Sequence, residues 1–313
     1  MSGASAPFFA EVADGPEGAH AVWLKAADGV RIRLALWPLE GARGTVVLLP
    51  GRTEYAEKYG RTAADMAARG YAMVAVDWRG QGLADRPLTD PMTGHVGDFA
   101  EYQADLDAVF AHLARSDMPE PWYLLGHSMG GCIALRGVMR GLPVQAVAFS
   151  APMWGILIAA WMRPLAVALS TASKYFAFDH RYAPGTGART YVLDAPFLGN
   201  SLTTDAEMWG YMRDQAQARP ELTLGGPSLG WLKAALHECH ALAQMPAPRL
   251  PALTGLGTQE RIVDVAPVHA RMAGWPGGRL ELFTGAEHEV LMERAPHRLR
   301  FRDLACDLFD AHR

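Results

Sequence analysis

Short apolar runs, each long enough for one buried strand, alternate along most of the chain with stretches that have the apolar spacing of helices. This alternation indicates an α/β protein with a mostly parallel sheet covered by helices on both faces. The turn signal Asp28-Gly29 predicts that the first two runs pair as an antiparallel hairpin. The eight predicted strands are Ala21–Lys25, Ile32–Trp37, Thr45–Leu49, Ala72–Val76, Trp122–Leu125, Ala146–Ser150, Ala252–Leu256 and Arg279–Phe283.

The alternation stops between Pro152 and Pro248, where helical patterns and loops occur without a convincing strand. Thr204 and Glu207 have the spacing of a capping box, and Ser228 is expected to cap a helix that runs to Leu242. We therefore expect an N-terminal arm at 1–20, an α/β core at 21–151 and 249–313, and an inserted helical lid at 152–248. The helices expected in the core are Tyr59–Arg69, Phe99–Ser116, Met129–Arg140, Val265–Ala273 and Pro296–Ala311.

One motif lies between a predicted strand and a predicted helix. Gly126-His127-Ser128-Met129-Gly130-Gly131 contains the G-x-S-x-G pattern, which places a serine on a tight turn with its hydroxyl exposed. Strand and helix nearly touch at such a turn, so the neighbouring positions have no room for side chains. We predict that Ser128 is a nucleophile and that His127 beside it is only packed.

A serine hydroxyl is a weak nucleophile and needs a base that a third group orients. Catalytic groups gather at the carboxyl ends of parallel strands, and His288 follows the last predicted strand closely. Glu260 is the first acid beyond the preceding strand, and we favour it as the group that orients His288. Asp264 is the alternative acid, although it also suits the N-cap of the following helix. The chain order of serine, acid and histidine is the usual one for this elbow.

Negative charge that develops on the acyl oxygen needs two backbone N–H donors. Met129, which follows the nucleophile, is expected to supply one. The turn after Thr45–Leu49 supplies the other, and Pro50 is excluded because it has no N–H. We choose Arg52 for this role, with Thr53 in reserve.

Composition and charge narrow the class of protein. The chain has 313 residues, is 50% hydrophobic and carries a net charge of −4, which gives no footprint for nucleic acid. Three widely separated cysteines suit a reducing compartment, and the N-terminus has no secretory signal, so we expect a cytoplasmic protein. The apolar stretch 153–172 is too broken to span a bilayer, but a transient contact of the lid with a membrane surface fits it.

No cofactor and no metal are expected. The chain has no Gly-rich loop with the spacing that a dinucleotide needs. His237 and His240 have ligand-like spacing on one helix face, but no third ligand is apparent.

Several segments together resemble the α/β-hydrolase superfamily: the G-H-S-M-G-G elbow, Asp77-Trp-Arg-Gly-Gln-Gly82, Arg261-Ile-Val-Asp264 and His288-Glu-Val-Leu-Met-Glu-Arg294. Within it, the chain resembles the branch of bacterial lysophospholipases and monoacylglycerol lipases, the serine aminopeptidase-like hydrolases. Two positions depart from that pattern. Pro50-Gly51 stands where His-Gly is usual, and Glu260 stands where the triad acid is usually aspartate.

The resemblance implies a serine hydrolase that cleaves a carboxyl ester through an acyl-enzyme. The implied enzyme is a lysophospholipase or monoacylglycerol lipase, and its substrate is a small acyl ester or lipid. An aminopeptidase or amidase is the alternative, and it would need lid carboxylates that bind a free amino group. The available acids there are Asp194, Asp205, Glu207 and Glu221. A non-catalytic binding protein is the third hypothesis, against which the intact serine, histidine and acid argue.

Overall fold

The fold is built on one nine-stranded sheet in the order β1-β2-β3-β5-β4-β6-β7-β8-β9. The computed structural model describes residues 3–158, 173 and 178–313. The strands are β1 (Ala4–Ala6), β2 (His20–Lys25), β3 (Arg31–Trp37), β4 (Thr45–Leu49), β5 (Ala72–Asp77), β6 (Trp122–His127), β7 (Val147–Ser150), β8 (Ala252–Gly257) and β9 (Gly278–Phe283). All neighbours from β5 onward in this order are parallel, whereas β1, β2 and β3 pair antiparallel, including the predicted hairpin of β2 and β3.

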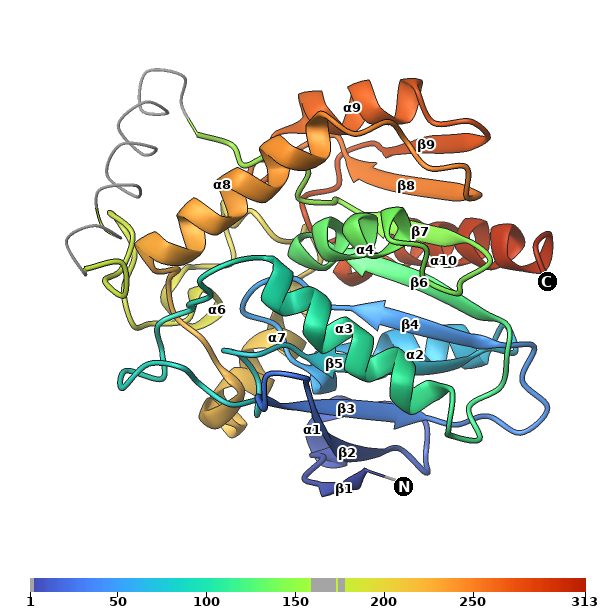
Figure 1. The fold of residues 1–313 in the computed structure, drawn as a ribbon, viewed down its shortest axis with the longest axis horizontal. Coiled ribbons are helices and arrows are strands. Elements are labelled where there is room, and N and C mark those ends of the chain that lie inside the picture. The colour runs from blue at the N-terminus through green and yellow to red at the C-terminus, as the bar shows by residue number, and fades with distance from the viewer. Residues whose placement is uncertain (1–2, 159–172, 174–177) are drawn as a thin grey trace.

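Helices cover both faces of the sheet, as Figure 1 shows. On one face α3, α4, α8 and α9 pack on a core that contains Leu106, Ile133 and Val268. On the other face α2, α7 and α10 pack on a second core that contains Met66 and Phe301. The helices are α1 (Ala10–Ala13), η1 (Ala56–Tyr59), α2 (Gly60–Ala67), α3 (Ala100–Leu113), α4 (Met129–Met139), α6 (Tyr191–Asp194), α7 (Ala206–Ala218), η2 (Pro220–Leu222), α8 (Leu229–Ala243), α9 (Val265–Ala273), η3 (Val290–Met292) and α10 (Ala295–Asp310).

The predicted fold class is confirmed, with one more strand than expected. Ala4–Ala6, placed by the sequence in the N-terminal arm, forms β1 and pairs with β2 at the edge of the sheet. Three small residues carry no strand signal of their own, so only this pairing defines the strand.

The start of α7 also differs from the prediction. Asp205 is its N-cap and accepts hydrogen bonds from the amides of Glu207 and Met208, whereas Thr204 donates its hydroxyl to Glu293 at 2.6 Å.

The described part of the insertion between β7 and β8 contains α6, α7, η2 and α8 and no strand of the sheet. Ser228 caps α8 as predicted, because its Oγ accepts a hydrogen bond from the amide of Trp231 at 3.0 Å. Most of the apolar stretch 153–172 lies outside the described residues. None of the described helices is long and apolar enough to cross a membrane.

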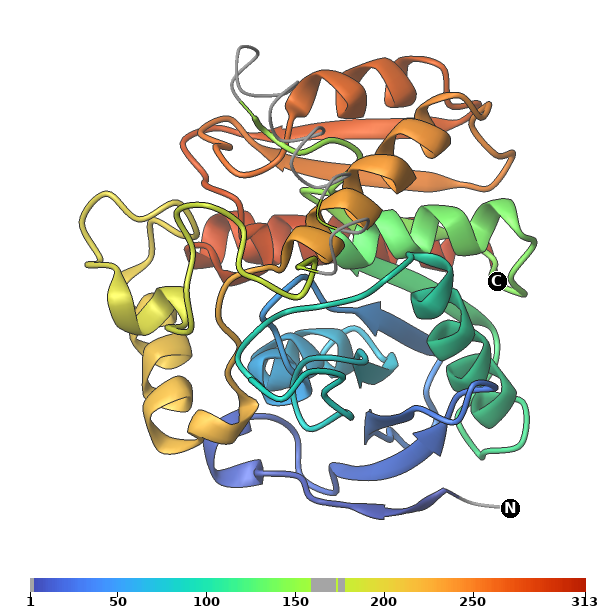
Figure 2. The same cartoon turned by 60° about the vertical axis from the view of Figure 1, so that its left-hand side comes forward.

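The N-terminal segment connects the sheet to α7. The hydroxyl of Tyr211 donates to the carbonyl of Ala13 at 2.6 Å, and Nε2 of Gln215 donates to the carbonyl of Val12 at 2.7 Å. Figure 2 shows the blue α1 directly beside the gold α7. On its other side the segment is fixed to β3, because Arg33 donates to the carbonyl of Pro7 at 2.9 Å.

Arg33 also forms the most buried ion pairs of the sheet. Its guanidinium lies 2.6 Å from Glu57 and 2.7 Å from Asp77, and none of the three side chains is exposed. Burial alone lowers the pKa of Arg33, but the two carboxylates outweigh burial and raise the pKa above its usual value. Arg33 therefore stays charged and joins β3, η1 and the end of β5.

Replacing Arg33 is expected to destabilise the protein strongly. R33M leaves two buried carboxylates without a counterion, a change that lowers the free energy of unfolding by about 3–5 kcal/mol. R31M is the matched control, because Arg31 on the same strand pairs with Asp85 at the surface and such pairs contribute about 0–1 kcal/mol. Urea unfolding of both variants measures the difference, and equal losses would contradict the structural importance of Arg33.

Candidate active site

Ser128 lies on the sharp turn between β6 and α4, in a strained backbone conformation with φ of 50°. Such a conformation costs about 1–3 kcal/mol and persists only when the surroundings enforce it. Here the amide of Ser128 donates to the carbonyl of Ser150, and its carbonyl accepts from the amide of Met153. A Cβ atom at Gly130 would lie 1.9 Å from the carbonyl oxygen of Leu49 in β4. Gly130 is therefore required by contact with the backbone of the neighbouring strand, whereas a Cβ atom at Gly126 would lie 2.9 Å from Cα of Gly131 at the start of α4.

His288 and Glu260 meet at the carboxyl ends of β9 and β8, at the edge of the sheet where Ser128 also lies. Nδ1 of His288 is 2.7 Å from Oε2 of Glu260, and both side chains are buried. The other carboxylate oxygen of Glu260 accepts hydrogen bonds from the amides of Ile262 at 2.6 Å and Val263 at 3.0 Å. Glu260 thus holds the ring of His288 through one nitrogen and leaves Nε2 for another partner.

His288 and Glu260 shift each other's pKa. Burial lowers the pKa of His288, but the hydrogen bond and the charge of Glu260 outweigh burial and raise it above the usual histidine value. Burial raises the pKa of Glu260, but the hydrogen bond and the charge of His288, together with the amides of Ile262 and Val263, outweigh burial and lower the pKa below its usual value. Asp264, the alternative acid, caps α9 and accepts a hydrogen bond from the amide of Ala266 at 3.1 Å.

The turn after β4 is fixed by side chains from two directions. The amide of Gly51 donates to Glu54, and Nε2 of Gln81 donates to the carbonyls of Gly51 at 2.8 Å and Glu54 at 2.9 Å. The amides of Arg52 and Met129, the two predicted oxyanion donors, have no acceptor among the described residues. Since the amide of Gly51 is already used, Arg52 remains the first free donor of this turn.

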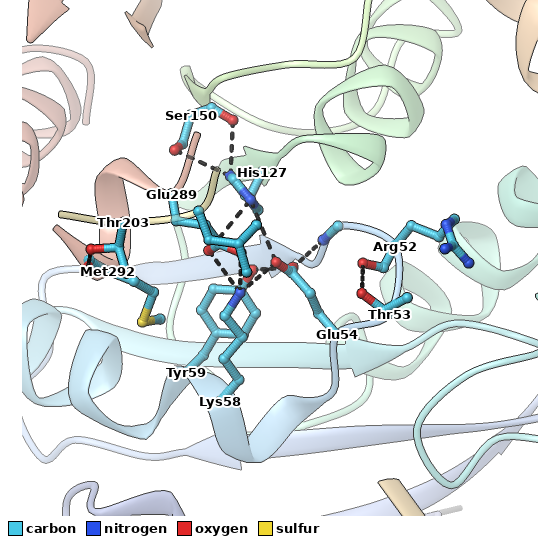
Figure 3. A network of polar contacts seen from close by, with 12 residues as sticks. Arg52, Thr53, Glu54, Lys58, Tyr59, His127, Ser150, Thr203, Glu289 and Met292 are labelled. Atoms are coloured by element: carbon cyan, nitrogen blue, oxygen red, sulfur yellow. Dashed lines mark hydrogen bonds and ion pairs between the residues drawn. The ribbon is translucent and has the colours of Figure 1, made fainter. Parts of the chain in front are cut away.

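A buried ion cluster that sequence reasoning missed lies beside these groups (Figure 3). Nζ of Lys58 is 2.6 Å from Glu54 and 2.6 Å from Glu289, and all three side chains are almost completely buried. Glu54 also accepts a hydrogen bond from the hydroxyl of Tyr59. The one available signal was the i,i+4 spacing of Glu54 and Lys58, because Glu289 is 231 residues away from Lys58 in the chain.

His127 packs against this cluster. Its Nδ1 lies 3.1 Å from the carbonyl of Ser150, and its Nε2 lies 3.4 Å from Glu54. Burial is the largest effect on its pKa and lowers it to about 3, so the ring is neutral at neutral pH. The ring centre of His127 is 4.9 Å from that of His288.

The same cluster contains the side chains best placed to hold a metal ion within the described part of the chain. Ligand atoms of Glu54, His127 and Glu289 lie within 4.8 Å of one another. The ammonium of Lys58 contacts both carboxylates, however, and supplies the positive charge that a cation would supply. The arrangement therefore fits an internal ion pair better than a metal centre.

A cavity of about 540 Å³ is lined by Ser128 and His288 together with residues of the insertion. Among the aromatic and methionine side chains of the insertion, Tyr191 and Met212 line this cavity. Trp154, Met208 and Trp209 are buried in the two cores, and Trp161 and Phe176 lie outside the described residues.

An aminopeptidase or amidase function would need one of four lid acids to bind an amino group. Asp194 lines the cavity but pairs with Arg189 at 3.0 Å. Asp205 caps α7, and Glu207 pairs with Arg61 at 2.8 Å. Glu221 lies 3.7 Å from Arg219. Each of these acids therefore has a partner in the protein already.

Known proteins with similar sequences are ester hydrolases by name. Lysophospholipase L2 of Escherichia coli strain K12 is 33% identical over 298 residues, which cover 91% of this chain and 86% of that protein. The probable lysophospholipase L2 of Haemophilus influenzae is 28% identical and covers 84% of this chain and 82% of its own length.

Solved structures support the fold. A soluble variant of monoglyceride lipase from Saccharomyces cerevisiae, in complex with a substrate analog, superposes with a TM-score of 0.72 at 19% identity and covers 93% of this chain and 95% of that one. The family model described as serine aminopeptidase, S33, matches residues 40–295. The resemblance drawn from the elbow and the strand-end motifs is thereby confirmed: the chain belongs to the serine aminopeptidase family S33, within the α/β-hydrolases.

Proposed function

We propose that the protein hydrolyses carboxyl esters with Ser128 as nucleophile, His288 as general base and Glu260 as the acid that orients His288. The observation that carries this proposal is the position of His288, which Glu260 holds at 2.7 Å in the wall of the cavity that also contains Ser128. The chain is a serine carboxyl-ester hydrolase of the lysophospholipase and lipase type by family and relatives.

The reaction proceeds in two halves. Oγ of Ser128 attacks the acyl carbon while Nε2 of His288 takes its proton, and the amides of Arg52 and Met129 stabilise the oxyanion. His288 then gives the proton to the departing alcohol. Water, activated by the same ring, attacks the acyl-enzyme and releases the fatty acid. Glu260 stabilises the imidazolium in both halves and stays ionised because its pKa is lowered.

The substrate class we propose is a lysophospholipid or a monoacylglycerol. The cavity volume of about 540 Å³ lies within the range of roughly 300–1,000 Å³ that is typical of small-molecule sites. Apolar residues of the insertion form part of its wall, including Val192, Ala195, Met212 and Ala216, and they suit an acyl chain. The pairing of the lid acids supports an ester over an aminopeptidase substrate.

We also propose that the insertion at 152–248 acts as the lid of this cavity and touches a membrane surface from which a lipid is taken. Leu198 is 84% exposed and Tyr191 is 41% exposed, and Tyr191 also lines the cavity. Exposed apolar and aromatic side chains of this kind suit the headgroup region of a bilayer.

The three cysteines are free thiols, which supports a cytoplasmic location.

Removal of the Ser128 hydroxyl is expected to abolish catalysis without unfolding the protein. S128A lowers kcat/KM for a p-nitrophenyl ester by about 10⁴-fold or more, because no other group can form the acyl-enzyme. A fluorophosphonate probe should label the wild type and not S128A. Ser201 lines the same cavity, so S201A is the control that should still be labelled. Labelling that persists in S128A would contradict the assignment.

A comparison of ester and anilide substrates tests whether the protein is an esterase or an aminopeptidase. We expect acyl p-nitrophenyl esters to be hydrolysed with a higher kcat/KM than aminoacyl p-nitroanilides, because the structure leaves no unpaired lid acid among Asp194, Asp205, Glu207 and Glu221 to bind an amino group. Steady-state rates with both substrate types measure the preference. Anilide turnover well above ester turnover would overturn the lipase-like function.

The pH profile tests Glu260. Since Glu260 raises the pKa of His288, the wild type is expected to lose activity as pH falls through a value above the usual histidine pKa. E260Q removes the charge, lowers the pKa of His288 and therefore moves the acid limb of the kcat/KM profile to lower pH, while kcat falls by about 10²–10⁴-fold.

D264A is the matched control for that experiment. Loss of the α9 cap lowers the free energy of unfolding by about 1 kcal/mol and leaves the acid limb in place. Equal shifts of the acid limb in the two variants would show that the acid is not Glu260.

A further inference from the structure

Arg52 is a cation in the wall of the cavity that the proposed reaction does not use through its side chain. The other charged groups in that wall have ionic partners. Lys58 contacts Glu54 and Glu289, and Arg189 contacts Asp194. Within residues 3–158, 173 and 178–313, no carboxylate lies within ion-pair distance of Arg52, and Figure 3 shows its guanidinium directed away from Glu54.

The surroundings of Arg52 satisfy only part of its hydrogen-bonding capacity. Nη1 donates to the carbonyl of Gly225 at 3.0 Å, and the guanidinium lies 5.5 Å from the ring centre of Trp231. Nε and Nη2 donate to no group in the described part of the chain. Gly94 is in close contact as well, because a Cβ atom there would lie 2.7 Å from Nη1. The guanidinium is thus held in place while several of its N–H groups stay available.

Arg52 is nevertheless charged. Burial lowers its pKa to about 10, which is still well above neutral pH. Arg52 is half-buried, and a partly desolvated guanidinium without a counterion is unfavourable in the free protein. Charged groups of this kind in a cavity are candidates for binding a ligand of opposite charge. A purely structural role, as a link to the loop at 223–227, would use the one hydrogen bond to Gly225 and leave the remaining donors unexplained.

We propose that the side chain of Arg52 binds the phosphate group of a lysophospholipid whose acyl ester lies at Ser128. This inference rests on the proposed ester hydrolysis and selects the phosphate-bearing substrate over the neutral monoacylglycerol. The planar guanidinium presents parallel N–H donors that match two phosphate oxygens. The backbone of Arg52 belongs to the oxyanion turn, so its side chain begins beside the position that the acyl carbonyl would occupy. From there it extends along the cavity wall toward Gly225.

The cavity wall supports a division between headgroup and chain. Gly225 and Gly226 lie beside the guanidinium, and the amide of Gly226 donates to the carbonyl of Gly187 at 2.7 Å. The cavity-lining residues on this side have small side chains or none: Gly185, Thr186, Gly187, Gly225 and Gly226. The apolar part of the wall comes from α6 and α7, through residues such as Val192 and Met212. A lysophospholipid has the same two parts, joined by a short glycerol spacer.

Two esters that differ only in the phosphate test this inference. The substrates are 1-octanoylglycerol and 1-octanoylglycerol 3-phosphate, and the readout is the ratio of their kcat/KM values, with phosphate as numerator. R52Q is expected to lower this ratio at least about tenfold, because the positive charge and the paired N–H donors of the guanidinium are lost together. R52K keeps the positive charge but not the paired N–H donors, and it should give an intermediate ratio. R189Q is the matched control, since Arg189 is 74% exposed and paired with Asp194, and its ratio should stay within about twofold of the wild type.

A binding measurement separates failure of this inference from failure of the proposed function. Titration calorimetry of S128A with 1-octanoylglycerol 3-phosphate should detect binding that S128A/R52Q loses, whether or not the wild type turns the ester over. If the wild type hydrolyses neither ester, the proposed function fails and the calorimetry alone decides on Arg52. An unchanged ratio in R52Q, or equal binding by both variants, would overturn the phosphate site. Thermal unfolding of R52Q confirms that the protein is folded.

Inorganic phosphate distinguishes a headgroup from a free anion as the natural ligand. Competitive inhibition of 1-octanoylglycerol hydrolysis at low millimolar phosphate, lost in R52Q, would show that the site takes the free anion and would overturn the headgroup assignment. Absence of inhibition together with a lowered ratio in R52Q supports the lysophospholipid.

Discussion

The ion cluster around Lys58 is the interaction on which the shape of the candidate active site depends. Its ammonium holds Glu54 and Glu289, two buried carboxylates that would otherwise repel each other in a dry environment. Glu54 belongs to the turn after β4 and binds the amide of Gly51, whereas Glu289 follows His288 directly. One positive charge therefore sets the position of the oxyanion turn relative to the catalytic histidine, although the two segments are far apart in the chain.

The neutral state of His127 completes this arrangement. Its ring lies close to that of His288, so a positive charge on it would oppose the imidazolium that forms when Ser128 loses its proton. Burial holds the pKa of His127 at about 3 and removes that opposition. Glu260, on the far side of the ring, is ionised and stabilises the same imidazolium. The site thus combines a hydrogen-bonded acid on one side of His288 with an uncharged ring on the other.

Features set by neighbouring residues in the chain were predictable from the sequence, whereas features set by contacts between distant residues were not. The strands of the core were predictable because β4, β5, β6 and β7 are buried along their whole length and read as apolar runs. Ser128, Glu260 and His288 were predictable as candidates because each lies just past a strand end. β1 was not predictable, because only its partner defines it. The contact of Lys58 with Glu289 was not predictable either, since nothing near Lys58 in the chain indicates a carboxylate from the end of the sheet.

The N-terminal segment has a consequence for specificity. It is fixed to β3 through Pro7 and to α7 through Val12 and Ala13, and α7 carries Met212 and Ala216 of the cavity wall. The segment from Pro7 to Ala13 therefore sets how far one wall of the pocket lies from the sheet. A change in the length of this segment, although remote from the catalytic motifs in the sequence, would move α7 and with it the space left for an acyl chain.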